Sequence, residues 1–308
     1  MRGRWADALR AFIAERRACG YAYGRSHVCA CERLCSFLGE RDMDEAAFAE
    51  WVAPRDGEAC RTRANRVGLW NVFAGFCVRR DIEAGSLRAD VRLESDFVPH
   101  IYTDEEASAV FSAADAGIAQ RRSPYEPSLI MPAFVRLLYS TGLRFSEAAG
   151  LRWDDVDGRR LSVLGKGGKP RLVVMSASMA EVLERYRGLR VGGGGGLVFC
   201  GREGGPLQNQ LVGTWHRTLL DSAGVRRADG AYPRLHDWRH TFAVGALARM
   251  DAAGVDVRAA LPVLSRYMGH CGPKETEWYL RLTDEGRAGV LERMELYAPH
   301  VAPGLGGV

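Results

Sequence analysis

Residues 264–280 read Leu264-Ser265-Arg266-Tyr267-Met268-Gly269-His270-Cys271-Gly272-Pro273-Lys274-Glu275-Thr276-Glu277-Trp278-Tyr279-Leu280. In this stretch an apolar run ends at Gly269-His270, a Gly-Pro break follows, and a segment able to form a helix presents Tyr279. A tyrosine hydroxyl has an ordinary pKa of about 10, so it is a weak nucleophile at neutral pH. If Tyr279 attacks a substrate, the rest of the chain must supply cations and a base around its hydroxyl.

Side chains of the required kinds lie upstream in three short stretches: Thr141-Gly142-Leu143-Arg144-Phe145-Ser146-Glu147, Gly165-Lys166-Gly167-Gly168-Lys169 and Leu235-His236-Asp237-Trp238-Arg239-His240-Thr241. His236 and Arg239 are three residues apart on a predicted helix, so both can face one site. Cleavage of a phosphodiester without a metal needs cations on the phosphate, an acid for the leaving oxygen and a nucleophile in line. Arginine, lysine and histidine can fill these needs around Tyr279.

These three stretches, together with Met268-Gly269-His270 and a tyrosine nine residues later, resemble the tyrosine recombinase (phage integrase) family. The resemblance implies site-specific cutting and rejoining of DNA through a 3′-phosphotyrosyl intermediate, with no metal and no cofactor. It implies these roles: nucleophile for Tyr279, phosphate binding for Arg144, Arg239 and His270, proton acceptor for His236, and general acid for Lys166. Trp238 stands where the family usually has leucine, which is a change in packing.

Three further residues near these stretches have alternative interpretations. Tyr267 is a rival nucleophile, but it precedes the motif and falls on an apolar helix face, which favours packing. Glu147 either orients a neighbouring basic group or is an exposed helix carboxylate. Lys169 shares its turn with Lys166, and the resemblance places the general acid at the lysine of Gly-Lys-Gly, which is Lys166.

Lysine is rare in this chain, because only three of its 42 basic residues are lysines: Lys166, Lys169 and Lys274. Arginine holds phosphate well but cannot release its proton near neutral pH. A lysine pair in one turn of such a chain therefore indicates a need for proton donation, with chance placement in a flexible turn as the alternative.

Composition places the chain among ordinary globular proteins. Its 308 residues can form two domains, and a net charge of +4 does not by itself indicate a nucleic-acid partner. The eight cysteines lack the paired Cys-x-x-Cys spacing of a zinc site, so we expect Cys29, Cys31 and Cys35 to be buried thiols and predict no metal. Without a signal peptide or a bilayer-spanning run, we expect a cytoplasmic, nucleoid-associated protein.

The predicted fold is mainly α with a small β-sheet (α+β). We expect a helical N-terminal core-binding domain over residues 1–96, a linker over 97–102, a catalytic domain over 103–298 and a flexible tail over 299–308. Thr103 and Glu106 have the spacing of a capping box at the start of the second domain. Apolar runs on both sides of the Gly-Lys-Gly-Gly-Lys-Pro turn predict a β-hairpin over 160–175, and residues 197–200 are expected to form a short strand.

The predicted DNA contacts are basic residues of both domains. Periodicity alone favours an ordinary solvated face for the arginines around a helix predicted over 61–79, whereas the family resemblance implies that this domain grips the DNA backbone. The predicted contacts are Arg61, Arg63, Arg66, Arg79, Arg80, Lys169 and Lys274.

The resemblance also implies binding partners, and it leaves alternative functions to be distinguished. The expected partners are double-stranded DNA recombination sites and further copies of this chain, assembled as a tetramer with itself or with related recombinases. A type IB topoisomerase would share the catalytic set and differ in lacking strand exchange between two sites. A non-catalytic DNA-binding accessory protein would be expected to have lost some of these side chains, and a cysteine-based zinc module would contain metal when purified.

Overall fold

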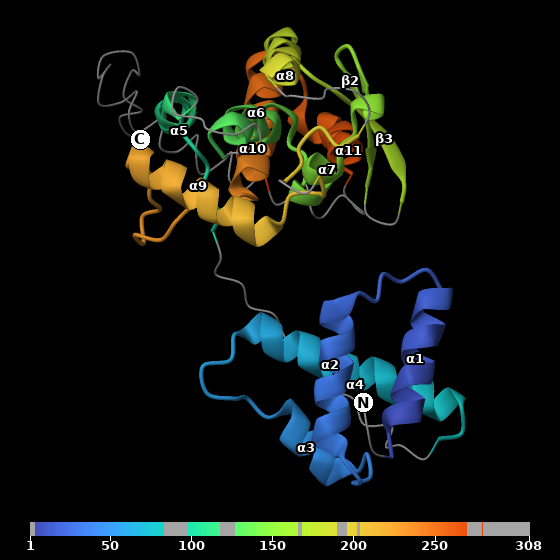
Figure 1. The fold of residues 1–308 in the computed structure, drawn as a ribbon. Coiled ribbons are helices and arrows are strands. Elements are labelled where there is room, and N and C mark those ends of the chain that lie inside the picture. Colours follow the sequence, from blue (N-terminus) through green and yellow to red (C-terminus); the bar gives the residue numbers. More distant parts are fainter. Residues whose placement is uncertain are drawn as a thin grey trace, which may run out of the picture. The chain divides into compact units, whose positions relative to one another are not determined.

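The computed structural model describes residues 4–82, 98–117, 127–165, 168–189, 196–201, 204–269 and Tyr279. The chain separates into two compact units, Met1–Phe97 and Val98–Val308 (Figure 1). Across the described residues the fold is mainly helical with one small sheet, which confirms the predicted fold class. The predicted end of the first domain at residue 96 and the tail over 299–308 lie outside the described residues, so the domain limits stay predictions.

The first unit is built from four helices: α1 (Ala6–Ala18), α2 (Arg25–Leu38), α3 (Glu45–Val52) and α4 (Cys60–Arg79). The long helix α4 packs against the other three and buries Trp70 and Phe73 among them. The α3 helix starts at Asp44, whose carboxylate accepts a hydrogen bond from the Ala47 amide, as an N-cap should. Cys31 and Cys35 are buried in this core, as predicted, whereas Cys29 is only half-buried.

Within the described residues the second unit contains seven helices and a small antiparallel sheet at one edge (Figure 1). The helices are α5 (Asp104–Ala116), α6 (Pro127–Thr141), α7 (Phe145–Gly150), α8 (Ala177–Leu189), α9 (Asn209–Ala223), α10 (Asp237–Ala252) and α11 (Val257–Met268). A 3-10 turn, Trp153–Asp155, precedes the strands β1 (Val156–Asp157), β2 (Arg160–Leu164) and β3 (Pro170–Val174), which lie in the order β1-β2-β3.

The predicted hairpin and capping box are both present. Strands β2 and β3 pair with Leu161 opposite Val173, and the core-facing side chains alternate with exposed ones along each strand. Thr103 and Glu106 form the reciprocal cap of α5. The prediction of a strand over 197–200 is wrong. This segment forms only isolated β-bridges, from Leu197 to Arg152 and from Cys200 to Pro206.

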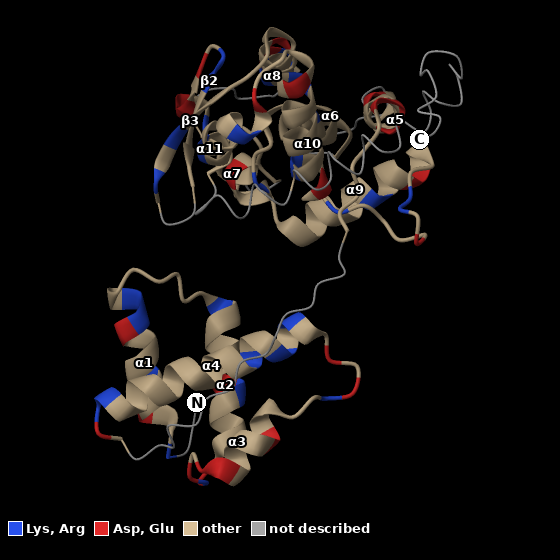
Figure 2. Cartoon of the chain, turned by 180° about the vertical axis from the view of Figure 1, so that it is seen from behind, with Lys and Arg blue, Asp and Glu red and all other residues tan. Residues whose placement is uncertain are grey.

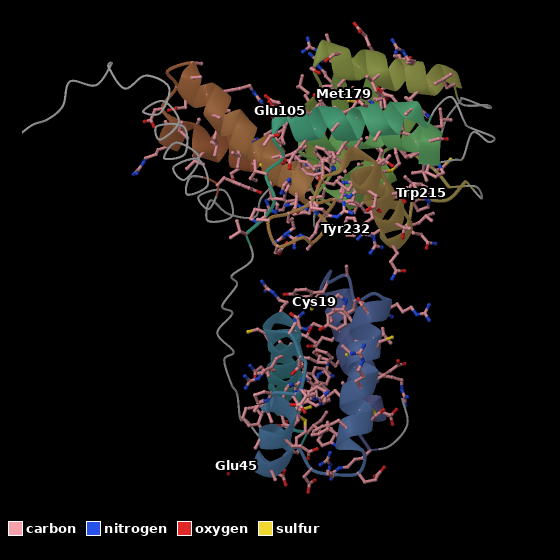
Figure 3. The ribbon with its side chains drawn as sticks, turned by 90° about the vertical axis from the view of Figure 1, so that its left-hand side faces the viewer. Cys19, Glu45, Glu105, Met179, Trp215 and Tyr232 are labelled. Carbon is pink, nitrogen blue, oxygen red and sulfur yellow. The ribbon has the colours of Figure 1, made fainter. Side chains whose placement is uncertain are left out.

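Helix α6 forms the centre of the second unit. It packs against α5, α8, α9 and α10 (Figure 1). Nearly all of its side chains from Leu129 to Leu138 are buried. Met179 of α8, labelled in Figure 3, is one of the side chains that fill the layer between α8 and the helices beneath it. None of the described helices combines the length and the apolar character that crossing a membrane requires.

Directly after α6 comes Gly142, which no other residue could replace unless its neighbours moved. Gly142 has φ +63°, and a Cβ on it would lie 2.4 Å from a ring carbon of Phe242 on α10. Glycine therefore allows both the left-handed turn after α6 and the close approach of α10. This turn leads directly into Arg144.

Trp238 of α10 packs as expected, at the centre of a buried aromatic cluster. Its ring stacks on Tyr102 with centroids 3.7 Å apart, and its Nε1–H donates to Nε2 of His216 on α9 at 3.0 Å. Burial lowers the pKa of His216 to about 4, so the ring is neutral at pH 7 and can accept this bond. The cluster thus joins the start of α10 to α9 and to the entry of α5.

We expect His216 to make stability depend on pH. Between its folded pKa of about 4 and the ordinary value near 6.5, the unfolded chain binds a proton that the folded chain does not. Stability is therefore fully present above about pH 6.5 and is lost as pH falls towards 4, by up to about 3 kcal/mol. Urea unfolding of wild type and His216→Leu from pH 4.5 to 7.5 measures this, and equal pH dependence in both proteins would refute it.

Candidate active site

The site is organised around the C-terminal end of α11. The carbonyl oxygens of Tyr267, Met268 and Gly269 face arginines from three other elements. Arg171 of β3 donates to Tyr267 at 2.8 Å, Arg144 donates to Gly269 at 2.9 Å, and Arg239 of α10 donates to Met268 at 2.6 Å. The end of a helix carries partial negative charge and unpaired carbonyls, so cations are favoured there.

Arg144 and Arg239 converge on one atom. Arg144 Nη1 also lies 3.4 Å from the Met268 carbonyl oxygen that Arg239 Nη2 contacts. Arg144 is the N-cap residue of α7. The two arginines that were predicted to share a phosphate are therefore brought together in the structure.

The two arginines differ in exposure. The side chain of Arg144 is 23% exposed, whereas Arg239 is only 1% exposed and also donates to the Gly142 carbonyl at 2.6 Å. Burial, and then the nearby charge of Arg144, lowers the pKa of Arg239 to about 10. Arg239 remains a cation at neutral pH, in a setting where its charge is little screened.

Glu147 holds this cationic cluster together. Its carboxylate is 3% exposed, pairs with both guanidinium nitrogens of Arg171 at 2.8 Å and accepts from Arg144 Nη1 at 3.1 Å. Burial alone would raise the pKa of Glu147, but the hydrogen bonds and charges of Arg171 and Arg144 hold it below its ordinary value. Of the two interpretations of Glu147, the structure supports the one in which it orients neighbouring basic groups.

Gly269 closes α11 in a position that only glycine fits. It has φ +67°, and a Cβ there would lie 2.9 Å from Arg171 Nη1. The glycine therefore lets the chain turn away from the helix while the Arg171 side chain lies against it. The next residue, His270, lies outside the described residues, so its predicted phosphate contact stays a prediction.

Tyr279 lies in the second unit with its hydroxyl beside a histidine of α10. The side chain is 3% exposed and packs with apolar residues of α10 and α11, including Ala243, Leu247 and Met268. Its Oη lies 3.0 Å from Nδ1 of His240. His240 directly follows Arg239 on α10, so the hydroxyl contacts the residue next to the buried arginine.

His236, the predicted proton acceptor, lies at the N-cap of α10, one turn before His240. The two imidazole rings meet edge to face, with centroids 4.8 Å apart. His236 is exposed by surface area, yet enough protein surrounds its ring that lost solvation, followed by the charges of Arg239 and Arg234, lowers its pKa to about 4. At neutral pH it is therefore uncharged and can accept a hydrogen bond.

Tyr267, the rival nucleophile, packs between secondary-structure elements. Its ring stacks on Phe242 with centroids 5.6 Å apart, and its hydroxyl donates to the Val174 carbonyl at 3.2 Å. Burial raises the pKa of its hydroxyl to about 12, which makes ionisation harder than usual. These contacts agree with the packing role expected for Tyr267.

The hairpin turn is described only in part. Lys169 is exposed, and its carbonyl accepts from the Gly165 amide at 2.9 Å, which closes the turn. Lys166 lies outside the described residues, as does Lys274 in the stretch before Tyr279. Their proposed roles in proton donation and DNA contact rest on the sequence.

The predicted DNA-contacting arginines of the first unit lie towards the two ends of α4, where Figure 2 shows blue segments. Arg61 is exposed, whereas Arg63 donates to the Val52 carbonyl at 2.9 Å. Arg66 has a side chain only 8% exposed and is paired with Glu58, so it has a structural role here. At the other end of the helix, Arg79 and Arg80 are exposed and both pair with Glu15.

Two side chains of the site were not identified from the sequence. Arg171 follows a proline on the outgoing strand of the hairpin, and no motif sets it apart from the many other arginines. His240 could have been found, because it is four residues after His236 and therefore on the same face of the helix. Among the described residues, no three His, Cys, Asp or Glu side chains gather as metal ligands.

We expect loss of the Glu147 carboxylate to destabilise the second unit strongly. Glu147→Leu leaves Arg171 buried without its partner, a change that typically costs about 3–5 kcal/mol. Glu184→Leu is the matched control, because Glu184 and Arg187 form an exposed pair, where the cost is about 1 kcal/mol or less. Urea unfolding at pH 7 compares the two, and similar losses would show that the buried pair has no special importance.

Comparison with known proteins agrees with this geometry. The sequence pattern described as the phage integrase family matches residues 104–285. The chain is 36% identical over 249 residues to the tyrosine recombinase XerC of Xylella fastidiosa (strain M23), covering 78% of this chain and 77% of that protein. It is 30% identical over 277 residues to the tyrosine recombinase XerC of Mycobacterium bovis (strain BCG / Pasteur 1173P2), covering 84% and 88%.

A solved structure shares the fold. The Tn1549 transposon integrase in complex with transposon right end DNA aligns with a TM-score of 0.63 at 18% identity, covering 92% of this chain and 99% of that one. At this identity the likeness concerns the fold alone. The family pattern and the XerC relatives carry the assignment: this chain belongs to the phage integrase family.

Proposed function

We propose that this chain is a site-specific DNA recombinase that cuts and rejoins DNA through a 3′-phosphotyrosyl link at Tyr279. The family assignment supports this activity, and the relatives named above are tyrosine recombinases. The observation that carries the proposal is the convergence of Arg144 and Arg239 on the Met268 carbonyl, with the Tyr279 hydroxyl in contact with His240, the residue after Arg239 on α10.

The two arginines bind the phosphate in this mechanism. A guanidinium has more N–H donors than the contacts with Met268, Gly269 and Gly142 require, so donors remain for non-bridging oxygens. Their charges stabilise the negative charge that develops on the phosphate as it is attacked. Glu147 and the carbonyls at the end of α11 hold both guanidinium groups in place before DNA binds.

The remaining roles are proposed from the sequence motifs. Tyr279 attacks the phosphorus, His236 accepts the phenolic proton, and Lys166 gives a proton to the departing 5′-oxygen. His270 hydrogen-bonds a phosphate oxygen. The covalent link conserves the energy of the broken bond, so the 5′-hydroxyl of a partner strand can reverse the reaction without a nucleotide or metal.

The proposed partners are double-stranded recombination sites and other copies of this chain. The solved neighbour is itself a complex with transposon end DNA, which supports a DNA partner for this fold. We propose that the first unit contacts the backbone through the exposed arginines Arg61, Arg79 and Arg80, whereas Arg66 first supports α4 through Glu58. A tetramer on two sites would allow strands to be exchanged between them.

We expect Tyr279→Phe to abolish the covalent protein–DNA adduct. Duplexes bound by the protein are first selected from a random pool, and a set of them is then nicked at successive positions to trap the cleaved state. Wild type should give an adduct that survives denaturing electrophoresis, and Tyr279→Phe should bind the same duplex without forming it.

Tyr267→Phe is the matched control for this experiment. It removes only the hydroxyl that contacts the Val174 carbonyl, so its adduct should form as in wild type. An adduct in Tyr279→Phe that disappears in Tyr267→Phe would reverse the assignment. The absence of an adduct in wild type on every nicked duplex would contradict the proposed function itself.

Lys166→Arg should slow cleavage by on the order of 10²-fold or more, because arginine keeps the charge but does not release its proton. Lys169→Arg, in the same turn, should have little effect. A substrate with sulfur in place of the leaving 5′-oxygen needs no proton, so it should restore the Lys166→Arg rate but not that of Arg144→Ala. Rescue of Lys169→Arg instead would move the general acid to Lys169.

A further inference from the structure

We propose that His240 is a catalytic residue of this site, which holds the Tyr279 hydroxyl and takes its proton as the oxygen attacks phosphorus. This inference rests on the proposed function and changes one part of it, because the sequence assigns proton acceptance to His236. Nδ1 of His240 lies 3.0 Å from the Tyr279 oxygen, the atom that would react.

The surroundings of Tyr279 make this contact important. The side chain is 3% exposed and packs against Ala243, Ala246 and Leu247, which lie on the same helix as His240. A buried phenol needs a hydrogen-bond partner, and one helix supplies both the apolar wall and the imidazole. The hydroxyl is therefore held at a defined place on α10, the helix on which Arg239 directly precedes His240.

The hydrogen-bond chemistry of the pair fits proton transfer. The phenol can donate to Nδ1 only if the His240 proton is on Nε2, the tautomer that leaves Nδ1 as an acceptor. Once Nδ1 has taken the proton, both ring nitrogens are donors, and Nδ1–H then donates to the tyrosyl oxygen. The hydrogen bond between His240 Nδ1 and the Tyr279 oxygen is thus kept before and after proton transfer, with little movement of either ring.

The step balances. The bond from Tyr279 Oη to phosphorus forms, the bond from phosphorus to the 5′-oxygen breaks, the phenolic proton moves to His240 Nδ1, and Lys166 protonates the departing oxygen. In the rejoining step, the 5′-hydroxyl returns its proton to Lys166, and the imidazolium returns a proton to the tyrosine oxygen as it leaves. No oxidant, metal or further reactant is required.

His236 is the less suitable acceptor in this arrangement. It lies one turn earlier, is exposed, and has its pKa lowered to about 4 by lost solvation and by Arg239 and Arg234. A group so hard to protonate is a weak base, because general-base efficiency falls as the pKa falls below the working pH. Its place at the N-cap, edge-on to His240, suits hydrogen bonding to the phosphate instead.

The test compares His240→Asn with His100→Asn in the full chain on the nicked duplexes. Asparagine can place an oxygen near the position of Nδ1, so it keeps a hydrogen-bond acceptor but cannot take the proton. We expect His240→Asn to bind DNA normally and to cleave on the order of 10²-fold more slowly. His100 pairs with Glu106 of α5, and its substitution should leave the rate within about twofold of wild type.

A substrate with a sulfur leaving group distinguishes proton transfer by His240 from a purely structural role of its side chain. The 5′-thio substrate should not rescue His240→Asn, because the lost proton transfer is at the nucleophile, whereas it should rescue Lys166→Arg. Rescue of His240→Asn, or a wild-type cleavage rate in that variant, would overturn the proposal. Failure of wild type to cleave any duplex would contradict the proposed recombinase function itself. Normal cleavage by His240→Asn would contradict only the role of His240, so the two outcomes can be told apart.

A second measurement examines the contact without DNA. In protein labelled with 15N-histidine, Nδ1 of His240 should have the chemical shift of a hydrogen-bonded acceptor, and Tyr279→Phe should move it. No change on removing the hydroxyl would overturn the proposed contact, whatever the cleavage data show.

Discussion

Three arginines on the last carbonyls of α11 are the interaction on which the second unit depends. They come from the N-cap of α7, from β3 and from α10, elements far apart in the sequence, and they meet on three consecutive residues, Tyr267 to Gly269. Three neighbouring cations repel one another, so their assembly requires compensating negative charge. The helix end and the carboxylate of Glu147 provide it.

This arrangement places charge before any substrate arrives. An enzyme that must stabilise a phosphate benefits from groups that need no reorganisation when the reaction begins. Here the folding of the unit has already gathered the guanidinium groups, because the same hydrogen bonds that end α11 orient Arg144 and Arg239. Stability and chemistry thus depend on the same contacts, which explains why the buried carboxylate of Glu147 belongs to the site.

Local signals in the sequence predicted the parts of this structure that local rules control. The cap at Thr103 and the hairpin pairing of β2 with β3 were both predicted correctly, because each depends on residues close in sequence. Arg171 was missed, because its role comes from pairing with a carboxylate 24 residues away and with a distant helix end. Periodicity likewise could not distinguish Arg66, buried against Glu58, from the exposed Arg61.

The exposed turn of the hairpin has a practical consequence. Lysine occurs only at positions 166, 169 and 274, so two of the three side-chain amines of the chain lie in this turn, and Lys169 is open to solvent. For reagents that acylate side-chain amines, Lys274 is therefore the one target in the sequence outside this turn. A fluorophore, a crosslinker or a lysine-specific protease acts mainly beside the site, which turns generic amine labelling of this protein into local labelling.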